Sequence, residues 1–129
     1  RVARSLPATP AGVRVGGDLD APVRTVAVCG GAGDDLFDDA RAVGADAYVT
    51  ADLRHHPASE SLEHGPPALV DCPHWATEWP WLADAESRLH AGLAARGTTV
   101  ETRVSRLVTD PWTSLASDPR PATHPGALR

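Results

Sequence analysis

A histidine and a glutamate stand four residues apart in the run from Asp71 to Glu78, DCPHWATE, directly after a short apolar stretch. If this run opens a helix, His74 and Glu78 lie on one face, because residues four apart are neighbours on a helix surface. Neutral imidazole and carboxylate together bind zinc, iron or manganese, and metal-bound water is a nucleophile near neutral pH. The structural alternative is that His74 caps the helix and Glu78 answers the positive charge of its N-terminus. Taken in isolation, the spacing favours the structural alternative, so the surrounding sequence has to decide.

A second polar cluster follows the apolar run 47–50 and contains Asp52, His55 and His56. Imidazole titrates near physiological pH, so either histidine could be a ligand, a general acid or base, or a contact to an anionic substrate. Solvent-exposed histidines in a loop are an equal alternative. Asp52 either orients one of these two histidines or starts a turn.

The elements that position these clusters alternate between strands and helices. Strands are predicted at 12–16 (an edge strand), 23–29, 47–50, 68–71 and 99–105. Helices are predicted at 36–43, 58–63 and 77–95, the last with Thr77 as N-cap and Pro80 in its first turn. This alternation predicts an α/β fold with a mainly parallel sheet, helices on both faces and consecutive βαβ units. Ligands collect beyond the carboxyl ends of such strands, where both polar clusters are expected to meet.

Two other features have a structural and a functional interpretation. The glycine-rich run 29–33 could cradle a phosphate on its backbone amides, but Asp34 and Asp35 place negative charge there, which favours a tight structural turn. The tryptophans at 75, 79 and 81 are expected in the core or at a subunit contact, and the wall of a pocket is the less favoured role. His64, His90 and His124 are expected at the surface without a role.

Composition limits the class of protein. The chain has 129 residues, enough for one domain, and a net charge of −5 with its arginines scattered singly, which does not favour a nucleic-acid partner. It shows neither a membrane span nor a secretory signal, so we expect a cytoplasmic protein with free thiols at Cys29 and Cys72. Because the chain lacks methionine, we expect a fragment of a longer protein. Its parts are predicted as a linker and edge strand (1–22), an α/β domain (23–113) and a disordered tail (114–129).

Four motifs together resemble a known family. They are VAVCGGAG at 26–33, GADAYVTAD at 44–52, HHP at 55–57 and HWATE at 74–78. In order and spacing they are similar to the C-terminal half of the GTP cyclohydrolase 1 type 2 homologues, also called Nif-three-like dinuclear metal centre hexameric proteins. The resemblance spans residues 5–113, and it shifts the interpretation of His74 and Glu78 from helix capping to metal binding.

The resemblance implies two divalent metal ions (zinc, iron or manganese) per full-length subunit of a toroidal homohexamer. His74 and Glu78 match the two ligands from the C-terminal half, and His56, with His55, matches a residue that handles substrate beside the metals. The implied activity is hydrolysis by metal-bound water. The N-terminal half with the other ligands is missing here, so weak metal binding is expected. Cys72 departs from the family pattern, and its thiol could approach the metal.

Two other functional classes compete with a hydrolase. A non-catalytic metal-binding or scaffold protein would use the tryptophan-rich surface for assembly into the hexamer. A nucleotide-binding regulator would use the glycine-rich run. The partners expected are therefore the missing half and further copies of the protein, with no membrane contact.

Overall fold

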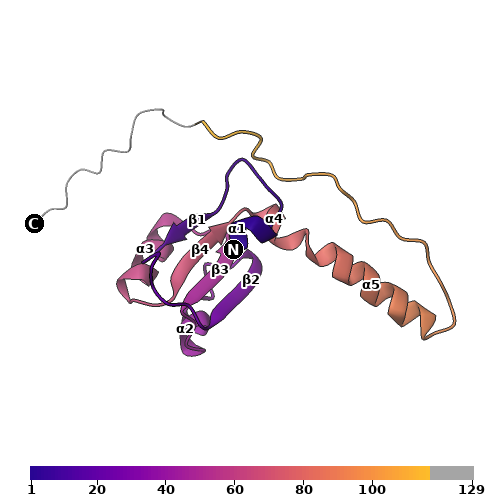
Figure 1. The fold of residues 1–129 in the computed structure, drawn as a ribbon, viewed down its shortest axis with the longest axis horizontal. Helices are drawn as coiled ribbons and strands as arrows, with labels where there is room; N and C mark the ends of the chain where they lie inside the picture. The colour runs from indigo at the N-terminus through magenta and orange to yellow at the C-terminus, as the bar shows by residue number, and fades with distance from the viewer. Residues whose placement is uncertain (117–129) are drawn as a thin grey trace, which may run out of the picture.

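The computed structural model describes residues 1–116, which fold around a single four-stranded sheet (Figure 1). The strands are β1 Arg14–Gly16, β2 Val26–Ala32, β3 Ala47–Ala51 and β4 Ala68–Cys72, in the spatial order β1-β4-β3-β2. β2, β3 and β4 run parallel, whereas the edge strand β1 pairs antiparallel with β4. The predicted α/β class is therefore confirmed. The mainly parallel sheet is confirmed only in part, because three strands are parallel and the fourth is antiparallel.

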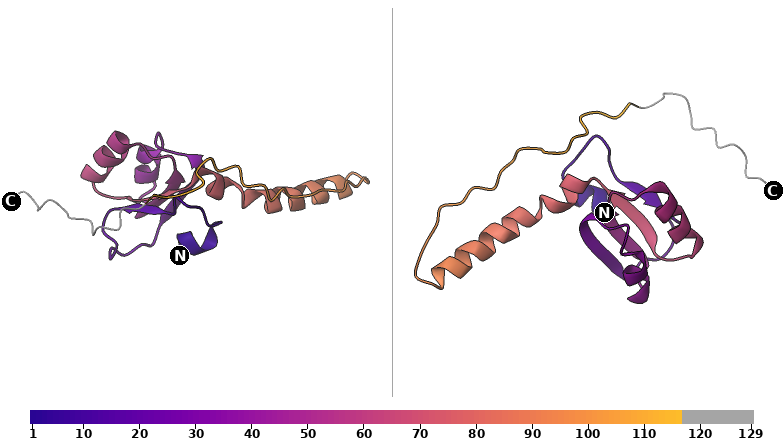
Figure 2. Two further views of the ribbon diagram at one scale, coloured as in Figure 1. Left: turned by 90° about the horizontal axis from the view of Figure 1, so that it is seen from above. Right: turned by 180° about the vertical axis from the view of Figure 1, so that it is seen from behind.

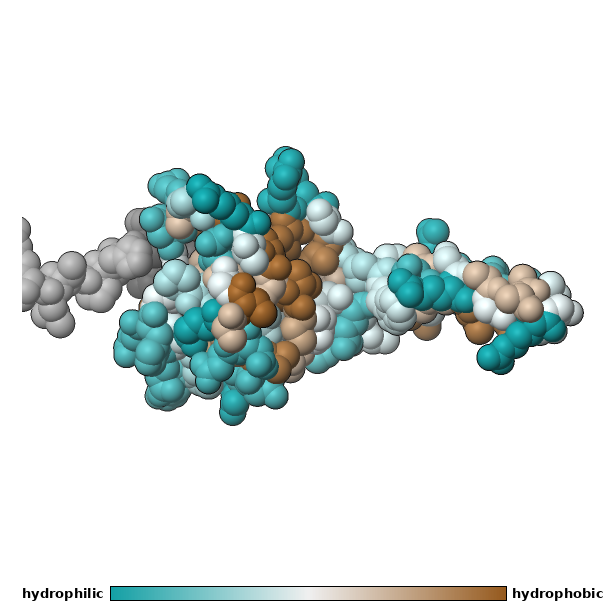
Figure 3. Space-filling model, turned by 90° about the horizontal axis from the view of Figure 1, so that it is seen from below, coloured by the Kyte–Doolittle hydropathy of each residue, from teal (hydrophilic) through white to brown (hydrophobic). Residues whose placement is uncertain are grey.

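Two helices make the crossovers between the parallel strands. α2 Phe37–Ala42 and α3 His55–Glu63 lie on one face of the sheet, and the short helix α1 Val2–Ser5 lies on the other (Figure 2, left). Crossovers between adjacent parallel strands are right-handed, which places successive helices on the same side. Helices cover the second face only in part, and Figure 3 shows an apolar stripe over the sheet domain. The exposed apolar side chains of β2 and the residues before it include Val23, Val26 and Val28.

The core lies between the sheet and the α2–α3 face. Phe37 of α2 meets Tyr48 of β3 edge to face, with the ring centroids 6.1 Å apart. Leu69 of β4 and Leu53 complete the buried cluster, at 2% and 8% exposure. Because β2 and β4 flank β3, this central strand is buried along its whole length. The core therefore fixes the carboxyl ends of β2, β3 and β4 relative to one another.

The predicted helix 77–95 is wrong in its boundaries, because two helices occupy this region. α4 His74–Glu78 begins at His74, so Thr77 lies inside it and is not an N-cap. α5 Trp81–Ala94 follows, with Pro80 as its N-cap residue. Proline has no N–H and its ring clashes with the carbonyl four residues earlier, so a continuous helix through residue 80 is disfavoured. α5 projects away from the sheet (Figures 1 and 2).

Residues after α5 return alongside that helix without forming a strand. The predicted strand at 99–105 is therefore wrong for this structure, because no neighbouring strand lies beside it within residues 1–116. Residues 114–116 have no regular secondary structure, and the rest of the predicted disordered tail lies outside the described residues. Within the described range, no helix combines the length and apolar character needed to cross a membrane.

Candidate metal centre

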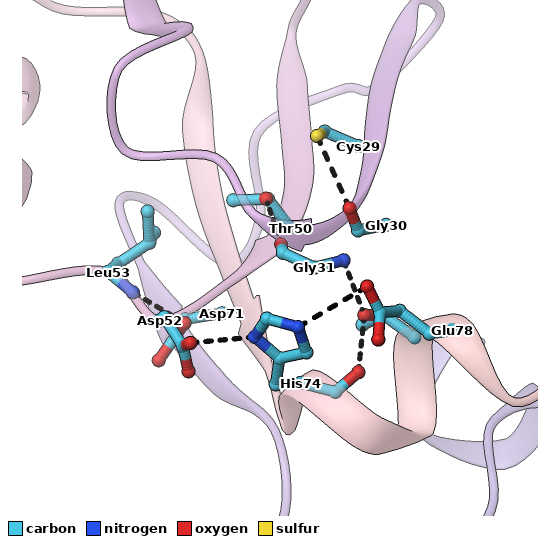
Figure 4. A network of polar contacts seen from close by, with 10 residues as sticks. Cys29, Gly30, Gly31, Thr50, Asp52, Leu53, Asp71, His74 and Glu78 are labelled. Atoms are coloured by element: carbon cyan, nitrogen blue, oxygen red, sulfur yellow. Dashed lines mark hydrogen bonds and ion pairs between the residues drawn. The ribbon is translucent and has the colours of Figure 1, made fainter.

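His74 and Glu78 meet where β4 ends and α4 begins (Figure 4). As the spacing predicts, the two side chains lie on one face of α4, with His74 Nε2 3.3 Å from Glu78 Oε1. Both remain accessible, with side-chain exposures of 43% and 57%. The structure therefore brings an imidazole nitrogen and a carboxylate oxygen to a shared, solvent-reachable point.

Asp52 holds the other side of the His74 ring. Its Oδ2 lies 2.7 Å from His74 Nδ1, so this carboxylate orients His74 and leaves Nε2 facing Glu78 (Figure 4). The hydrogen bond to Asp52 is the main reason that the pKa of His74 is raised, and the charge of Glu78 adds to it while partial burial opposes it. Sequence reasoning offered Asp52 as a partner for His55 or His56, and the structure gives it to His74 instead.

Asp52 has an unusual backbone that its neighbours hold in place. It has φ of 56°, in the left-handed region that non-glycine residues seldom occupy. The next amide, Leu53 N–H, donates to Asp71 Oδ1 at 3.1 Å, and Arg14 Nε donates to Asp71 Oδ2 at 2.7 Å. Asp71, at the end of β4, thus ties the loop after β3 to the edge strand β1. A strained residue that the surrounding structure fixes is typical of functional sites.

Gly31 keeps the space beside His74 and Glu78 open. It has φ of +74°, and a Cβ built there would lie 2.8 Å from Glu78 Oε1 and 3.2 Å from His74 Nε2. The residue is fixed by a bond from its N–H to Thr77 Oγ1 at 2.9 Å and by a bond from Thr50 Oγ1 to its carbonyl at 3.0 Å. Glycine is therefore required by both the backbone and the space.

The glycine-rich run is part of a strand and not a tight turn, so the predicted role was wrong. β2 continues through Gly30 and Gly31 to Ala32, with an irregular register against β3. The N–H of Gly31 is bound by Thr77, and that of Gly33 donates to the Ala51 carbonyl at 3.4 Å. Because these two N–H groups already donate to oxygens of the protein, they are not available to bind a phosphate.

The donor set fits a divalent metal ion but is incomplete. His74 Nε2 and Glu78 Oε1 are the ligand types that zinc, iron and manganese accept, and the missing Cβ of Gly31 leaves room beside both. Asp52 supplies the carboxylate that commonly supports a metal-binding histidine from its other nitrogen. No set of three or more His, Cys, Asp or Glu side chains in residues 1–116 could hold an ion. Within the described residues, the chain thus brings together two groups of the types that bind such ions.

A cleft surrounds this pair, and the segment after α5 forms one of its walls. The cleft has a volume of about 780 Å³. Asp52, Asp71, His74 and Glu78 contribute its polar surface, and Trp75 and Trp112 its aromatic surface. Residues 109–112 thus come back to the site from the far end of α5.

Cys72 also lines the cleft but is a poor ligand. Burial is the first cause that raises the pKa of its thiol, and the charge of Asp71 adds to it. Its Sγ lies 3.8 Å from the Val70 carbonyl. Metals bind the thiolate, so a thiol kept protonated competes weakly for the ion. Cys29 and Cys72 are both free, as the sequence predicts.

His55 and His56 are not brought to the His74 pair. Both are exposed in the first turn of α3, with their ring centroids 5.2 Å apart, and not in a loop as predicted. His55 lines a different groove, with Leu53 and Leu62, and neither histidine borders the cleft around His74. Their role in substrate handling stays a prediction.

The tryptophans lie at the surface of the site and not in the core. Trp75 and Trp79 pack against each other with centroids 6.1 Å apart, and Trp81 is 56% exposed. None of the three belongs to the buried core of the described residues. Trp75 lines the cleft, which supports the pocket-wall role that the sequence favoured least.

Sequence reasoning missed the parts played by Gly31, Arg14 and Asp71. Gly31 matters because it has no side chain. The atoms that a Cβ would contact there are known only once the fold is known. An acidic residue at the end of an otherwise apolar strand was a usable signal for Asp71. Arg14 carried no signal, because its pairing with Asp71 depends on strand register.

Comparisons with known proteins show which family the chain resembles. A model of the Duf34/NIF3 (NGG1p interacting factor 3) family matches residues 1–111. A Streptomyces coelicolor protein named GTP cyclohydrolase 1 type 2 homolog is 55% identical over 120 residues, which are 92% of this chain and 42% of that protein. A Mycobacterium leprae protein of the same name is 49% identical over 112 residues, 87% of this chain and 28% of that protein.

Solved structures show the same fold. A Bacillus cereus protein related to NIF3 matches with a TM-score of 0.73 at 36% identity, over 81% of this chain and 28% of that one. A Staphylococcus aureus protein matches with a TM-score of 0.74 at 26% identity, over 86% and 30%. The chain thus spans less than half the length of these relatives. On the matches to the family model and to its relatives, the chain belongs to the Duf34/NIF3 family.

Proposed function

We propose that this chain supplies half of the metal site of a dinuclear-metal-dependent hydrolase, with His74 and Glu78 as ligands. The observation that carries the proposal is the convergence of His74 Nε2 and Glu78 Oε1, 3.3 Å apart, on a space that Gly31 keeps free. A helix-capping role for His74 would need neither the glycine nor the carboxylate on Nδ1. Both features together favour a bound cation.

Each residue has a separate task in this proposal. Asp52 accepts a hydrogen bond from the Nδ1–H of His74. The lone pair of Nε2 is then free to bind the ion. Asp71 fixes the loop that carries Asp52. A bound divalent ion supplies Lewis acidity and lowers the pKa of water toward neutrality. His55 and His56 are proposed to contact substrate, and their exposure leaves them free to do so.

The full-length protein is proposed to hold two ions per subunit, zinc, iron or manganese, within a homohexamer. Two protein ligands leave most of the coordination sphere of an ion to water, whereas protein metal sites take three or four such ligands. The remaining protein ligands are therefore proposed to come from polypeptide outside this chain. We therefore expect the chain to bind one equivalent of metal weakly. The name of the relatives makes GTP the first substrate to test, followed by other nucleotides, phosphoesters and cyclic amides.

Metal titration of the chain tests the site. Isothermal titration calorimetry with Zn²⁺ and Mn²⁺ is expected to give a weak 1:1 isotherm that His74→Ala and Glu78→Gln each weaken at least about 10-fold. His64→Ala is the matched control, because His64 is an exposed histidine at the end of α3 and lies outside the cleft. Unchanged affinity in His74→Ala would remove the proposed site.

Activity is tested on the full-length Streptomyces coelicolor relative. Loaded with zinc, manganese or iron, it is expected to hydrolyse at least one of the substrate classes named above, and its chelated form to be inactive. Inactivity with both metal sites filled would favour the alternative, a metal-binding scaffold. That alternative has one observation in its favour, the exposed tryptophans Trp81 and Trp112 beside the site.

A further inference from the structure

α5 is a helix without the packing that normally stabilises one. None of its 14 residues is buried, and Leu82 and Leu89 are 39% and 48% exposed. Isolated helices shorter than about 12–15 residues are marginal in water, and helices in proteins gain most of their stability from a packed apolar face. α5 therefore gains little stability from packing within the described residues.

The segment after α5 runs back along the helix. Gly97, with φ of +72°, reverses the chain. Thr102 Oγ1 then donates to Glu86 Oε1 at 2.6 Å, and Trp79 Nε1 donates to the Ser105 carbonyl at 2.9 Å. These two contacts fix the segment antiparallel to α5. We refer to α5 together with residues 95–112 as the arm.

Within residues 1–116, the backbone of this segment pairs with side chains only, at Ser105, Leu107 and Trp112. Within the described part of the chain, no backbone N–H or C=O of residues 99–112 bonds to another backbone group. The sequence TTVETRVSRLV at 98–108 has the alternating, β-branched composition of a strand. Its apolar side chains are largely exposed, with Val100 at 46% and Leu107 at 77%. A segment of strand-like composition whose backbone has no backbone partner has the donors and acceptors that an edge strand offers to another chain.

The matches to solved relatives include part of the arm. Residues 1–80 and 113–129, which lie outside the arm, are 97 of the 129 residues or about 75% of the chain, so matches over 81% and 86% must extend into it. Those structures also contain roughly 70% of polypeptide that this chain does not match, and this polypeptide is the candidate to cover the arm.

We propose that residues 99–109 add as a strand to a sheet in the polypeptide that relatives carry beyond the matched segment, while α5 covers one face of that sheet. Strand addition uses the unpaired backbone for affinity and alternate side chains for specificity. Because residues 109–112 line the cleft at His74, the same docking brings the receiving polypeptide to the half-complete metal site. The docking itself does not depend on the proposed hydrolase activity.

Hydrogen exchange measured by mass spectrometry tests the pairing. Amides 99–109 are expected to exchange freely in this chain alone. They are expected to exchange at least about 100-fold more slowly when the chain is co-purified with the unmatched part of the Streptomyces coelicolor relative. The aligned segment of the intact relative provides a second measurement that does not require the separate part to fold. Free exchange in the intact relative would overturn the proposal.

Proline substitutions test strand geometry specifically. Consecutive amides of a strand point to opposite sides, so only one of Arg103→Pro and Val104→Pro removes a hydrogen bond to the receiving sheet. We expect one variant to weaken the complex about 10-fold or more and its neighbour to weaken it much less. Equal effects would contradict strand addition. Protection of residues 99–109 in a homodimer of this chain would also overturn the proposal, since a second copy would then be the partner.

Discussion

The sheet domain and the arm differ in how well their residues are packed and hydrogen-bonded. In the sheet domain, Tyr48 and Leu69 are nearly inaccessible and the loops that carry Asp52 and His74 are tied together by hydrogen bonds. In the arm, no residue of α5 is buried, and residues 99–112 form no backbone–backbone hydrogen bond within the described part of the chain. The sheet domain is thus internally packed around a core. α5 is not packed against the rest of the described residues, which is why we propose that the arm docks on further polypeptide.

This difference explains why the site is precise although the chain is partial. His74, Glu78 and Asp52 are positioned by β3, β4 and α4, all of which belong to the sheet domain. The arm contributes only a wall of the cleft. The geometry of the His74–Glu78 pair is thus set by the sheet domain and not by the arm.

The largest expected effect is a difference in the free energy of unfolding between a substitution in the sheet domain and one in the arm. Leu69→Ala should lower the free energy of unfolding by about 2–5 kcal/mol, because it leaves a cavity in the core. Leu89→Ala in the arm should change it by less than about 0.5 kcal/mol in this chain alone. Urea denaturation of the 129-residue chain measures both. Similar losses would mean that α5 is packed and that the comparison is wrong.

A glycine pair distinguishes space at the site from backbone strain. Gly31→Ala places a Cβ against Glu78 and His74, so metal affinity should fall about 10-fold or more. Gly44→Ala is the matched control, because Gly44 has a similar φ of +66° but no atom within 4 Å of the new Cβ. Both should lose about 1–2 kcal/mol of stability from the positive φ.

Calorimetric metal titration and urea denaturation of the two glycine variants provide the readouts. Equal loss of metal affinity in both would show that the empty space beside His74 is not part of the site.

Replacing Asp52 tests the support of the histidine ring. Asp52→Asn keeps a residue that tolerates the left-handed backbone but removes the charge, so the pKa of His74 should fall toward its ordinary value. Metal affinity should drop about 10-fold. NMR titration of the His74 ring protons follows the first effect and calorimetry the second. An unchanged pKa would show that Asp52 does not govern the ring.

The smallest expected effect is a pH dependence. The raised pKa of His74 means that the folded chain binds this proton more tightly than the unfolded chain does. Its stabilising contribution is therefore fully present below about pH 6.5 and is lost as the pH rises through the folded pKa. Partial exposure of the ring keeps the contribution small.

The pH dependence is measured by denaturant unfolding between about pH 5 and pH 8.5 with a chelator present, comparing the chain with His74→Ala. The variant should lack the decline with rising pH. Metal affinity should change in the opposite direction, because the proton on His74 competes with the ion. Parallel stability profiles would exclude His74 as the titrating group.

The sequence predicted the features that local pattern controls. The alternation of strands and helices gave the three parallel strands, and the spacing of His74 and Glu78 placed both on one helix face. The helix starting at His74 and the break at Pro80 were missed, because the composition of 77–95 is helical throughout.

What sequence could not supply depends on contacts across the fold. The space at Gly31 exists only because β2 passes beside α4, and the bond from Asp52 to His74 requires two loops to meet. The strand predicted at 99–105 does not form because a contact across the fold is missing. Its residues have the right composition, but a strand needs a partner, and within residues 1–116 it has none.

The interruption at Pro80 separates the His74–Glu78 pair from the arm mechanically. Glu78 ends α4 and Trp81 starts α5, so only two residues lie between this carboxylate and the first residue of the arm. A continuous rigid helix through both would transmit any tilt of the arm to the carboxylate. The break at Pro80 allows the arm to tilt while His74 and Glu78 keep their positions on α4.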